Sequence, residues 1–417
     1  MTSFLQKFLL IAGLFFGSLL PAKAYSVLTH EAIIDALWES SIKPLLKKQY
    51  PAATEAELVV AHGYAYGGAL MPDMGYFPFG SKFFTNLVHY VRSGDFVMTL
   101  LQDAHTLNDY AFAIGSLSHY NADKYGHSLG TNKAVPLVYP ETRKYGKIVT
   151  YEEDPIAHTR VEFGFDVLQT ARGNYASQTY HDFIGFHFAD TLLQTVFRKV
   201  YGLPLEELFG SYSKAVNSLR WSVKTLFPVI TRAAWASKKA DIQKAQPGTT
   251  ARNFRYKMSR KAYNKEFSHE GDKPGFFTRM LSGLITILPK IGPLKPLKFK
   301  VPGPEAEKLF VQSFDSVTAH YRAQLNELDN RKIDLTNYDY DTGIKTEPGE
   351  YQLADQTYQC LLINLKKEGY TTLNAPLQQT LLRFFATEKS AGAKKNNAAA
   401  QVAAALASLR QAVPVSK

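Results

Sequence analysis

The 417-residue chain contains a single cysteine, Cys360. One thiol excludes an intramolecular disulfide framework, so disulfides cannot staple this fold. After the first 24 residues, no segment reaches the roughly 18 uncharged apolar residues that a membrane-spanning helix needs. Alternating Val, Ile and Thr of the strand type is confined to a short run at 147–151, and there is no internal repeat. A fold built mainly on sheets is therefore not expected.

The N-terminus has the pattern of an export signal. Lys7 gives a short basic region, 8–20 is apolar but too short to span a bilayer comfortably, and 22–24 reads Ala-Lys-Ala. We therefore predict a signal peptide over residues 1–24, cleaved after Ala24. The mature chain would begin at Tyr25 and be secreted or periplasmic.

Helical spacing of apolar residues dominates the rest of the chain. We predict helices over 29–50, 54–70, 95–128, 158–171, 181–201, 204–240, 304–330 and 353–388. Pro72, Gly75, Pro78 and Gly80 predict a loop after the second helix. The expected fold is all-α, a multi-helix bundle whose polar ligands project inward into a cleft.

The net charge of +11 is concentrated in one region. Between Lys238 and Lys300, fifteen Lys and Arg stand against four Asp and Glu. This region could bind an anionic membrane, bind nucleic acid, or be a solvated insertion. The apolar residues embedded at 276–288 favour lipid.

These composition shifts divide the chain into five segments. The signal peptide is 1–24, the helical domain with the candidate site is 25–240, and 241–303 is a basic Pro/Gly-rich insertion. A C-terminal helical segment, 304–388, is expected to pack on the first domain. The tail, 389–417, is of low complexity and is expected to be weakly helical or disordered.

The most informative motif is His119-x-x-x-Asp123-x-x-x-His127, followed by Ser-Leu-Gly. On a helix these three side chains project from one face, because they are spaced at i, i+4 and i+8. Two imidazoles and a carboxylate on one stripe are suitable zinc ligands. A single histidine there would more often be a hydrogen-bonded core residue, whereas three spaced ligands favour a metal site.

Further candidate ligands surround this motif in the sequence. Nine of the eleven histidines lie between His30 and His187. Asp73 precedes His89 by sixteen residues, and His158-x-x-x-Glu162 places a second imidazole–carboxylate pair one helical turn apart. His30 lies five residues after the predicted mature N-terminus.

In this order, the motifs resemble the zinc-dependent phospholipase C superfamily. Within it, they are most similar to the branch that includes the N-terminal domain of glycosylphosphatidylinositol-specific phospholipase D. The resemblance covers residues 25–190. It is carried by Thr29-His30, Pro72-Asp73, the block from His119 to Gly130, and the pair His158 and Glu162.

The resemblance implies a site with two to three zinc ions. The implied metal ligands are Tyr25 (through its backbone amino nitrogen and carbonyl oxygen), His30, Asp73, His89, His119, Asp123, His127, His158 and Glu162. Asp73, His89, His119 and Asp123 would hold one ion, and Asp123 would bridge to a second ion held by His30 and Tyr25. The third ion would bind His127, His158 and Glu162. Related enzymes often begin with Trp, so Tyr25 is a departure, but its ligand atoms belong to the backbone.

The implied activity is hydrolysis of a phosphodiester by metal-activated water, as in phospholipase C or D, with a phospholipid or membrane surface as partner. Asp73 is the candidate for an additional catalytic base, although metal binding alone would explain its carboxylate. The superfamily's fungal single-strand nucleases have five residues, not three, between the bridging Asp and the next His. No nucleic-acid partner is therefore expected.

Two alternatives stay open, a zinc-dependent nuclease of the same superfamily and a non-catalytic, metal-stabilised membrane-binding protein. The headgroup, the side of the phosphorus that is cleaved and the oligomeric state are not determined by the sequence. Residues 339–343, Asp-Tyr-Asp-Thr-Gly, are interpreted as a turn and not as a calcium loop, because the spacing to the next Glu does not fit an EF-hand.

Overall fold

The computed structural model describes residues 27–172, 185–223, 227–250, 298–386 and 397–415. The first half comprises α2 (Val27–Leu37), η1 (Trp38–Ile42), α3 (Lys43–Gln49), α4 (Glu55–Leu70), η2 (Met71–Tyr76), α5 (Lys82–Tyr90), α6 (Ser93–Asp103), α7 (Leu107–Gly126), η3 (His127–Thr131), α8 (Asn132–Val138), η4 (Pro140–Tyr145) and α9 (Pro155–Arg172). There follow α10 (Asp190–Tyr201), η5 (Leu205–Leu208), α11 (Tyr212–Trp221), α12 (Phe227–Ala245), α15 (Pro304–Asp329), α16 (Gln352–Lys367), α17 (Ala375–Phe384) and α18 (Asn397–Gln411).

The all-α prediction is confirmed. Within the described ranges, extended pairing is limited to one isolated bridge, Tyr338 with Lys345. None of the described helices combines the length and the apolar character needed to cross a bilayer. The predicted signal peptide and Tyr25 lie outside the described residues, as does most of the basic insertion.

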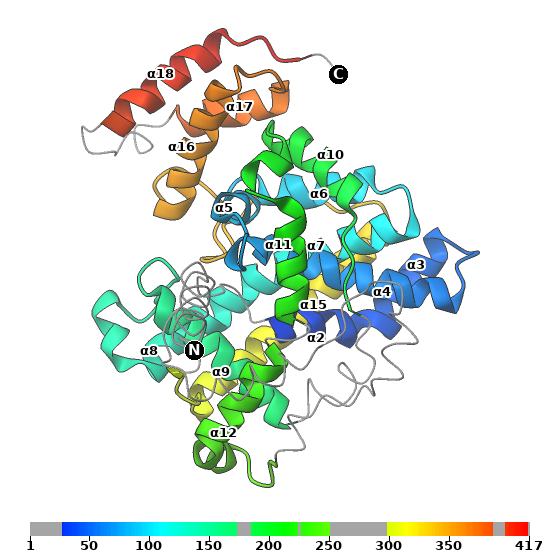
Figure 1. Cartoon of the computed structure of the whole chain (residues 1–417), viewed down its shortest axis with the longest axis vertical. Coiled ribbons are helices and arrows are strands. Elements are labelled where there is room, and N and C mark those ends of the chain that lie inside the picture. Colours follow the sequence, from blue (N-terminus) through cyan, green and yellow to red (C-terminus); the bar gives the residue numbers. More distant parts are fainter. Residues whose placement is uncertain (1–26, 173–184, 224–226, 251–297, 387–396, 416–417) are drawn as a thin grey trace, which may run out of the picture.

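Helix α7 runs through the centre of the bundle and packs closely on α4 (Figure 1). It begins at a capping box in which Thr106 and Asp109 satisfy each other's backbone N–H groups. Two glycines allow the close approach, since a Cβ on Gly115 would lie 2.0 Å from the carbonyl oxygen of Ala65 and one on Gly68 would lie 1.9 Å from that of Phe112. Only a residue without a side chain fits at these positions.

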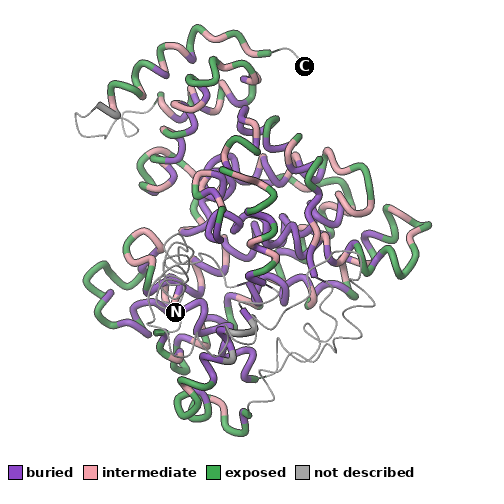
Figure 2. The backbone as a smooth tube through the Cα atoms, in the orientation of Figure 1, coloured by how far each residue is buried: buried purple, intermediate pink, exposed green. Residues whose placement is uncertain are grey.

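Other helices cover this central pair and bury it. Helix α15 lies along α7, where the Tyr321 hydroxyl donates to the Ile114 carbonyl at 2.9 Å. A second, smaller apolar cluster joins α2, α8, α9 and α15, with Phe165 stacked on Phe310. Figure 2 shows the buried residues concentrated along these central helices. The candidate ligands therefore belong to the best-packed part of the chain.

Several element boundaries differ from the sequence prediction. The expected helix 95–128 is two helices, α6 and α7, separated at Ala104–Thr106 because Thr106 caps a new helix. The predicted helix 204–240 likewise divides into η5, α11 and α12, and 353–388 into α16 and α17. Helix α5 was not predicted. In the tail, 397–411 forms α18, whose Ala405 and Leu409 are buried.

The C-terminal helices form a group of their own. Figure 1 shows α16, α17 and α18 together at one end of the molecule. Helix α16 packs on α5 and on α18. Between α15 and α16, residues 330–351 run back toward the middle of the bundle, which becomes important for the site.

Candidate metal centre

Four of the predicted ligands come together from three elements. Asp73 on η2, His89 on α5, and His119 and Asp123 on α7 each offer a ligand atom, and these atoms all lie within 4.8 Å of one another. All four side chains are buried. We call them the first group.

Asp123 lies at the middle of the first group. Its Oδ2 is 3.1 Å from His119 Nε2 and 3.3 Å from His89 Nε2. Its other oxygen, Oδ1, is 3.5 Å from Nε2 of His30, whose ring stacks on that of His119 with centroids 4.4 Å apart. The Asp123 carboxylate can therefore serve two neighbouring ions through different oxygens.

Asp73 faces the same space from the opposite side. Its Oδ1 is 3.4 Å from His89 Nε2, and its Oδ2 is 3.7 Å from His30 Nε2. Thr85 fixes η2 to α5, because its hydroxyl donates to the Pro72 carbonyl at 2.7 Å and accepts from the Gly75 N–H at 2.8 Å. The short helix η2, which carries Asp73, is thereby held against the helix that carries His89.

A second group consists of His127, His158 and Glu162. Their ligand atoms also lie within 4.8 Å of one another. Glu162 Oε1 is 3.2 Å from His127 Nε2 and 3.4 Å from His158 Nε2. Helix α9 presents His158 and Glu162 on adjacent turns, and Asp154 caps it by accepting from the Ala157 N–H at 2.9 Å. His127 comes from the first residue of the π-turn η3, directly after α7.

Backbone carbonyls orient three of the imidazoles. Nδ1 lies 2.9 Å from the Thr85 carbonyl in His89 and 2.8 Å from the Ala69 carbonyl in His119. In His127, Nδ1 lies 3.2 Å from the Tyr340 carbonyl. A carbonyl only accepts, so each neutral ring carries its proton on Nδ1 and directs the Nε2 lone pair into the centre. Metal-binding histidines are typically supported in this way.

The electrostatics of the first group suit a metal. Burial, together with the neighbouring His119, lowers the pKa of His30 well below its usual range, and burial also lowers the pKa of His89. Burial acts to raise the pKa of Asp123, but the surrounding imidazoles, His119 foremost, hold it well below its usual range. His30 and His89 are thus held neutral beside an ionised Asp123, the protonation states that metals require.

The second group holds a proton more tightly when no metal is bound. Burial raises the pKa of Glu162 to about 7, although His127 opposes the shift. Burial acts to lower the pKa of His127, but Asp123, Asp341 and Glu162 together raise it well above its usual range. Binding of a cation there would displace that proton.

The donor atoms fit zinc. Imidazole nitrogens and carboxylate oxygens are its usual ligands alongside thiolate. The ion pairs of the buried Asp123 in the described part of the chain are all with imidazoles, so a divalent cation would compensate a charge that is costly to bury. The structure thus brings seven predicted residues into two groups, with His30 beside Asp73 and Asp123. Tyr25, the ninth, lies outside the described residues.

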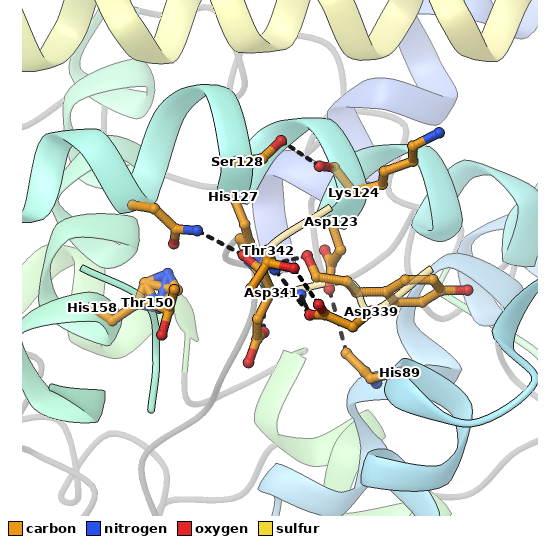
Figure 3. Close-up of polar contacts among 12 residues, drawn as sticks. His89, Asp123, Lys124, His127, Ser128, Thr150, His158, Asp339, Asp341 and Thr342 are labelled. Atoms are coloured by element: carbon orange, nitrogen blue, oxygen red, sulfur yellow. Dashed lines mark hydrogen bonds and ion pairs between the residues drawn. The ribbon is translucent and has the colours of Figure 1, made fainter. Parts of the chain in front are cut away.

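Sequence reasoning missed the contribution of the 339–343 turn. The turn itself is present, but Asp341 is buried and its Oδ1 lies 3.6 Å from Nδ1 of His127 (Figure 3). The sequence of the turn does not predict this contact, because His127 lies more than 200 residues earlier in the chain.

The comparison with family models agrees with this centre. Residues 29–210 match the family described as zinc dependent phospholipase C, and they include every candidate ligand that the structure describes. Searches of curated proteins and of solved structures gave no match. Residues 29–210, which hold both groups of candidate ligands, are therefore similar to the zinc-dependent phospholipase C superfamily.

Proposed function

We propose that this protein is an exported zinc-dependent phosphodiesterase that hydrolyses phospholipid or phospholipid-like diesters. The observation that carries the proposal is the pair of buried nitrogen and oxygen donor groups inside the segment that matches a zinc-dependent phospholipase family. Similarity to that family supports hydrolase activity, whereas the diester substrate and the export are our inference.

In this proposal each group would hold one zinc ion, and His30, Asp123 and the predicted mature N-terminal residue Tyr25 would hold a third. The 3.5 Å approach of His30 Nε2 to Asp123 Oδ1 supports the bridging role of Asp123. The backbone amine and carbonyl of Tyr25 would complete that third position. Two ions would satisfy the two described groups, and a third would require the processed N-terminus.

Zinc held in these groups would supply an activated water and positive charge for in-line attack on phosphorus. The residues of the chain prepare for this reaction. The carbonyl contacts of His89, His119 and His127 keep their Nε2 atoms directed inward, and burial keeps the donors away from bulk water. Asp73, between His30 and His89, would accept a proton from the attacking water if it acts as a base in addition to binding metal.

The spacing within α7 and η3 favours a lipid substrate. Three residues separate Asp123 from His127, as in the phospholipase C/D branch, whereas the superfamily's single-strand nucleases have five. A nuclease would also need aromatic side chains on which unpaired bases stack. Of the basic, partly apolar region proposed to meet an anionic membrane, residues 251–297 lie outside the described residues.

Product analysis tests this proposal directly. Mature protein purified without chelators is incubated with mixed phospholipid vesicles, and with single-stranded DNA and RNA in parallel. We expect either phosphorylated headgroup and diacylglycerol, or free headgroup and phosphatidate, with little nucleotide release. A chelator should abolish turnover and added zinc should restore it. His320→Ala is a matched control, because His320 is exposed and outside both groups.

Two other results would replace the proposal. Robust nuclease activity without lipid hydrolysis would establish the nuclease alternative. Full zinc content without activity on either substrate would favour a non-catalytic metal-stabilised protein, and vesicle binding would then be measured. Absence of bound zinc in chelator-free preparations would contradict the metal centre itself.

A further inference from the structure

Residues 335–345 pass behind both metal groups, although they lie far outside the family-matched segment. They are anchored at α6, where the Ser93 hydroxyl donates to the Tyr338 carbonyl at 2.6 Å and the Asn337 side chain accepts from the Asp95 N–H at 2.9 Å. They are also anchored at α7, where the Tyr120 hydroxyl donates to the Thr336 carbonyl at 2.9 Å. We call residues 335–345 the clasp.

The backbone of Tyr340 connects the two groups. Its N–H donates to the carbonyl of His89 at 3.2 Å, and its own carbonyl lies 3.2 Å from Nδ1 of His127. Its ring lies against the rings of His89 and His119, with centroids 5.3 and 5.9 Å away. One residue of the clasp thus contacts ligands of both groups.

Asp341 places a negative charge behind His127. Its Oδ1 is 3.6 Å from Nδ1 of His127, while Nε2 of that ring faces Glu162. Its Oδ2 accepts hydrogen bonds from the hydroxyls of Tyr90 at 2.8 Å and Tyr351 at 2.6 Å, and its carbonyl accepts from the Asn132 side chain at 2.6 Å. The carboxylate is therefore buried, held in place and directed at the Nδ1 side of the imidazole, opposite the Nε2 side that faces Glu162.

The rest of the turn fixes this arrangement (Figure 3). Asp339 Oδ1 accepts from the N–H groups of Asp341 at 3.0 Å and Thr342 at 2.9 Å. Gly343 has a φ of +71°, and a Cβ there would lie 2.6 Å from the Lys124 carbonyl. The turn is therefore seated directly on the last turn of α7, between Asp123 and His127.

We infer that the clasp completes the metal centre and that Asp341 is a positioning residue for His127. A carboxylate behind a metal-binding imidazole fixes its tautomer and orientation and makes it a stronger ligand. Losing such a partner typically weakens metal binding 10- to 100-fold. This inference rests on the zinc assignment of the proposed function.

The test compares Asp341→Asn with Asp339→Asn in the full, zinc-loaded protein. Asparagine preserves the shape and an acceptor oxygen, so both variants should fold, and far-ultraviolet circular dichroism checks this. Zinc is withdrawn with increasing chelator and the ion remaining per chain is measured. We expect Asp341→Asn to release one zinc ion per chain at a chelator concentration 10- to 100-fold lower than wild type requires. Asp339→Asn, in the same turn, keeps an oxygen that can accept from the Asp341 and Thr342 N–H groups, so Asp341 stays in place and zinc retention should match wild type.

A double-mutant cycle assigns the lost ion to the second group. In a His158→Ala background, where that group is already broken, Asp341→Asn should produce no further loss of zinc. The absorption spectrum of the cobalt-substituted protein should change with Asp341→Asn and not with Asp339→Asn, which a purely structural role would not predict.

The outcomes separate the two proposals. Wild-type zinc retention and an unchanged cobalt spectrum in Asp341→Asn would overturn the inference while leaving the proposed function intact. Equal losses in both aspartate variants would overturn the positioning role of Asp341, because the turn as a whole would then be responsible. A wild-type protein that binds no zinc would instead refute the proposed function.

Discussion

His119 Nε2 lies 3.1 Å from Asp123 Oδ2 across one turn of α7, and the same carboxylate approaches His30 through its other oxygen. We predict that Asp123→Asn loses most of the bound zinc, since one substitution would weaken two ion positions. Activity should fall by more than about a hundredfold, beyond what outer partners of a metal usually contribute. Metal analysis and diester hydrolysis measure both effects. An Asp123→Asn protein with full zinc content would contradict the bridging role.

The close packing of α4 on α7 predicts that a larger residue at this contact weakens zinc binding in the first group. Gly115→Ala would place a methyl group 2.0 Å from the Ala65 carbonyl and force the helices apart. The Ala69 carbonyl that orients His119 belongs to this contact. We expect destabilisation of roughly 1–3 kcal/mol from overpacking, with weaker zinc retention. Thermal unfolding and chelator competition measure these changes.

Gly210→Ala is the control for the glycine experiment, because a Cβ there meets nothing within 4 Å. It should leave both the unfolding temperature and zinc retention near wild type. If Gly115→Ala also left the unfolding temperature and zinc retention unchanged, α4 and α7 could move apart without loss. The close approach of these helices would then not be needed to position His119.

The sequence predicts contacts between residues that are close in the chain better than contacts between residues that are far apart in it. The spacing of His119, Asp123 and His127 correctly indicates one helical stripe, because i, i+4 geometry is local. Spacing alone does not show that His119 and Asp123 belong to the first group and His127 to the second. His127, the first residue after α7, contacts Glu162 of α9, whereas His119 lies in the first group.

Helix α5 shows a second limit. It has nine residues and follows a loop rich in Gly and Pro, so its short apolar pattern is obscured. Its N-cap, Ser81, accepts from the Phe84 N–H at 3.2 Å and was a usable signal. The sequence therefore offers His89 as a candidate ligand without predicting the helix that positions it. Neither local spacing nor the family motifs identify Asp341, because its partners come from elements distant in the sequence.

The start of α2 motivates a prediction about the processed N-terminus. Asp166 accepts hydrogen bonds from the Leu28 N–H at 3.2 Å and the Thr29 hydroxyl at 2.7 Å, which fixes the chain just before His30. If Tyr25 supplies its amine to zinc, a tag or uncleaved leader before Tyr25 should lower both zinc content and activity. Proteolytic exposure of Tyr25 should restore them.

The control for the N-terminal experiment carries the same tag at the C-terminus. It should behave like untagged protein. An N-terminally extended chain with full zinc content and full activity would remove Tyr25 from the ligand set. His30 would then bind a site formed by Asp73 and Asp123 alone.

Asp339 predicts how stability depends on pH. Burial, reinforced by the nearby Asp341, raises its pKa to about 7 from an ordinary value of 3.8. The folded protein thus binds a proton at Asp339 more tightly than the unfolded chain does. The stability that this proton contributes is fully present below about pH 4 and is lost as pH rises toward about 7.

Asp339→Asn removes this dependence, because the amide oxygen can still accept from the Asp341 and Thr342 N–H groups but cannot ionise. The variant should therefore gain stability relative to wild type as pH rises from 5 to about 7, and the difference should level off above that. Denaturant unfolding of both proteins in excess zinc at several pH values measures it, and effects common to both cancel. A difference that stays constant, or that shrinks as pH rises, would mean that Asp339 is ionised in the folded protein throughout this range.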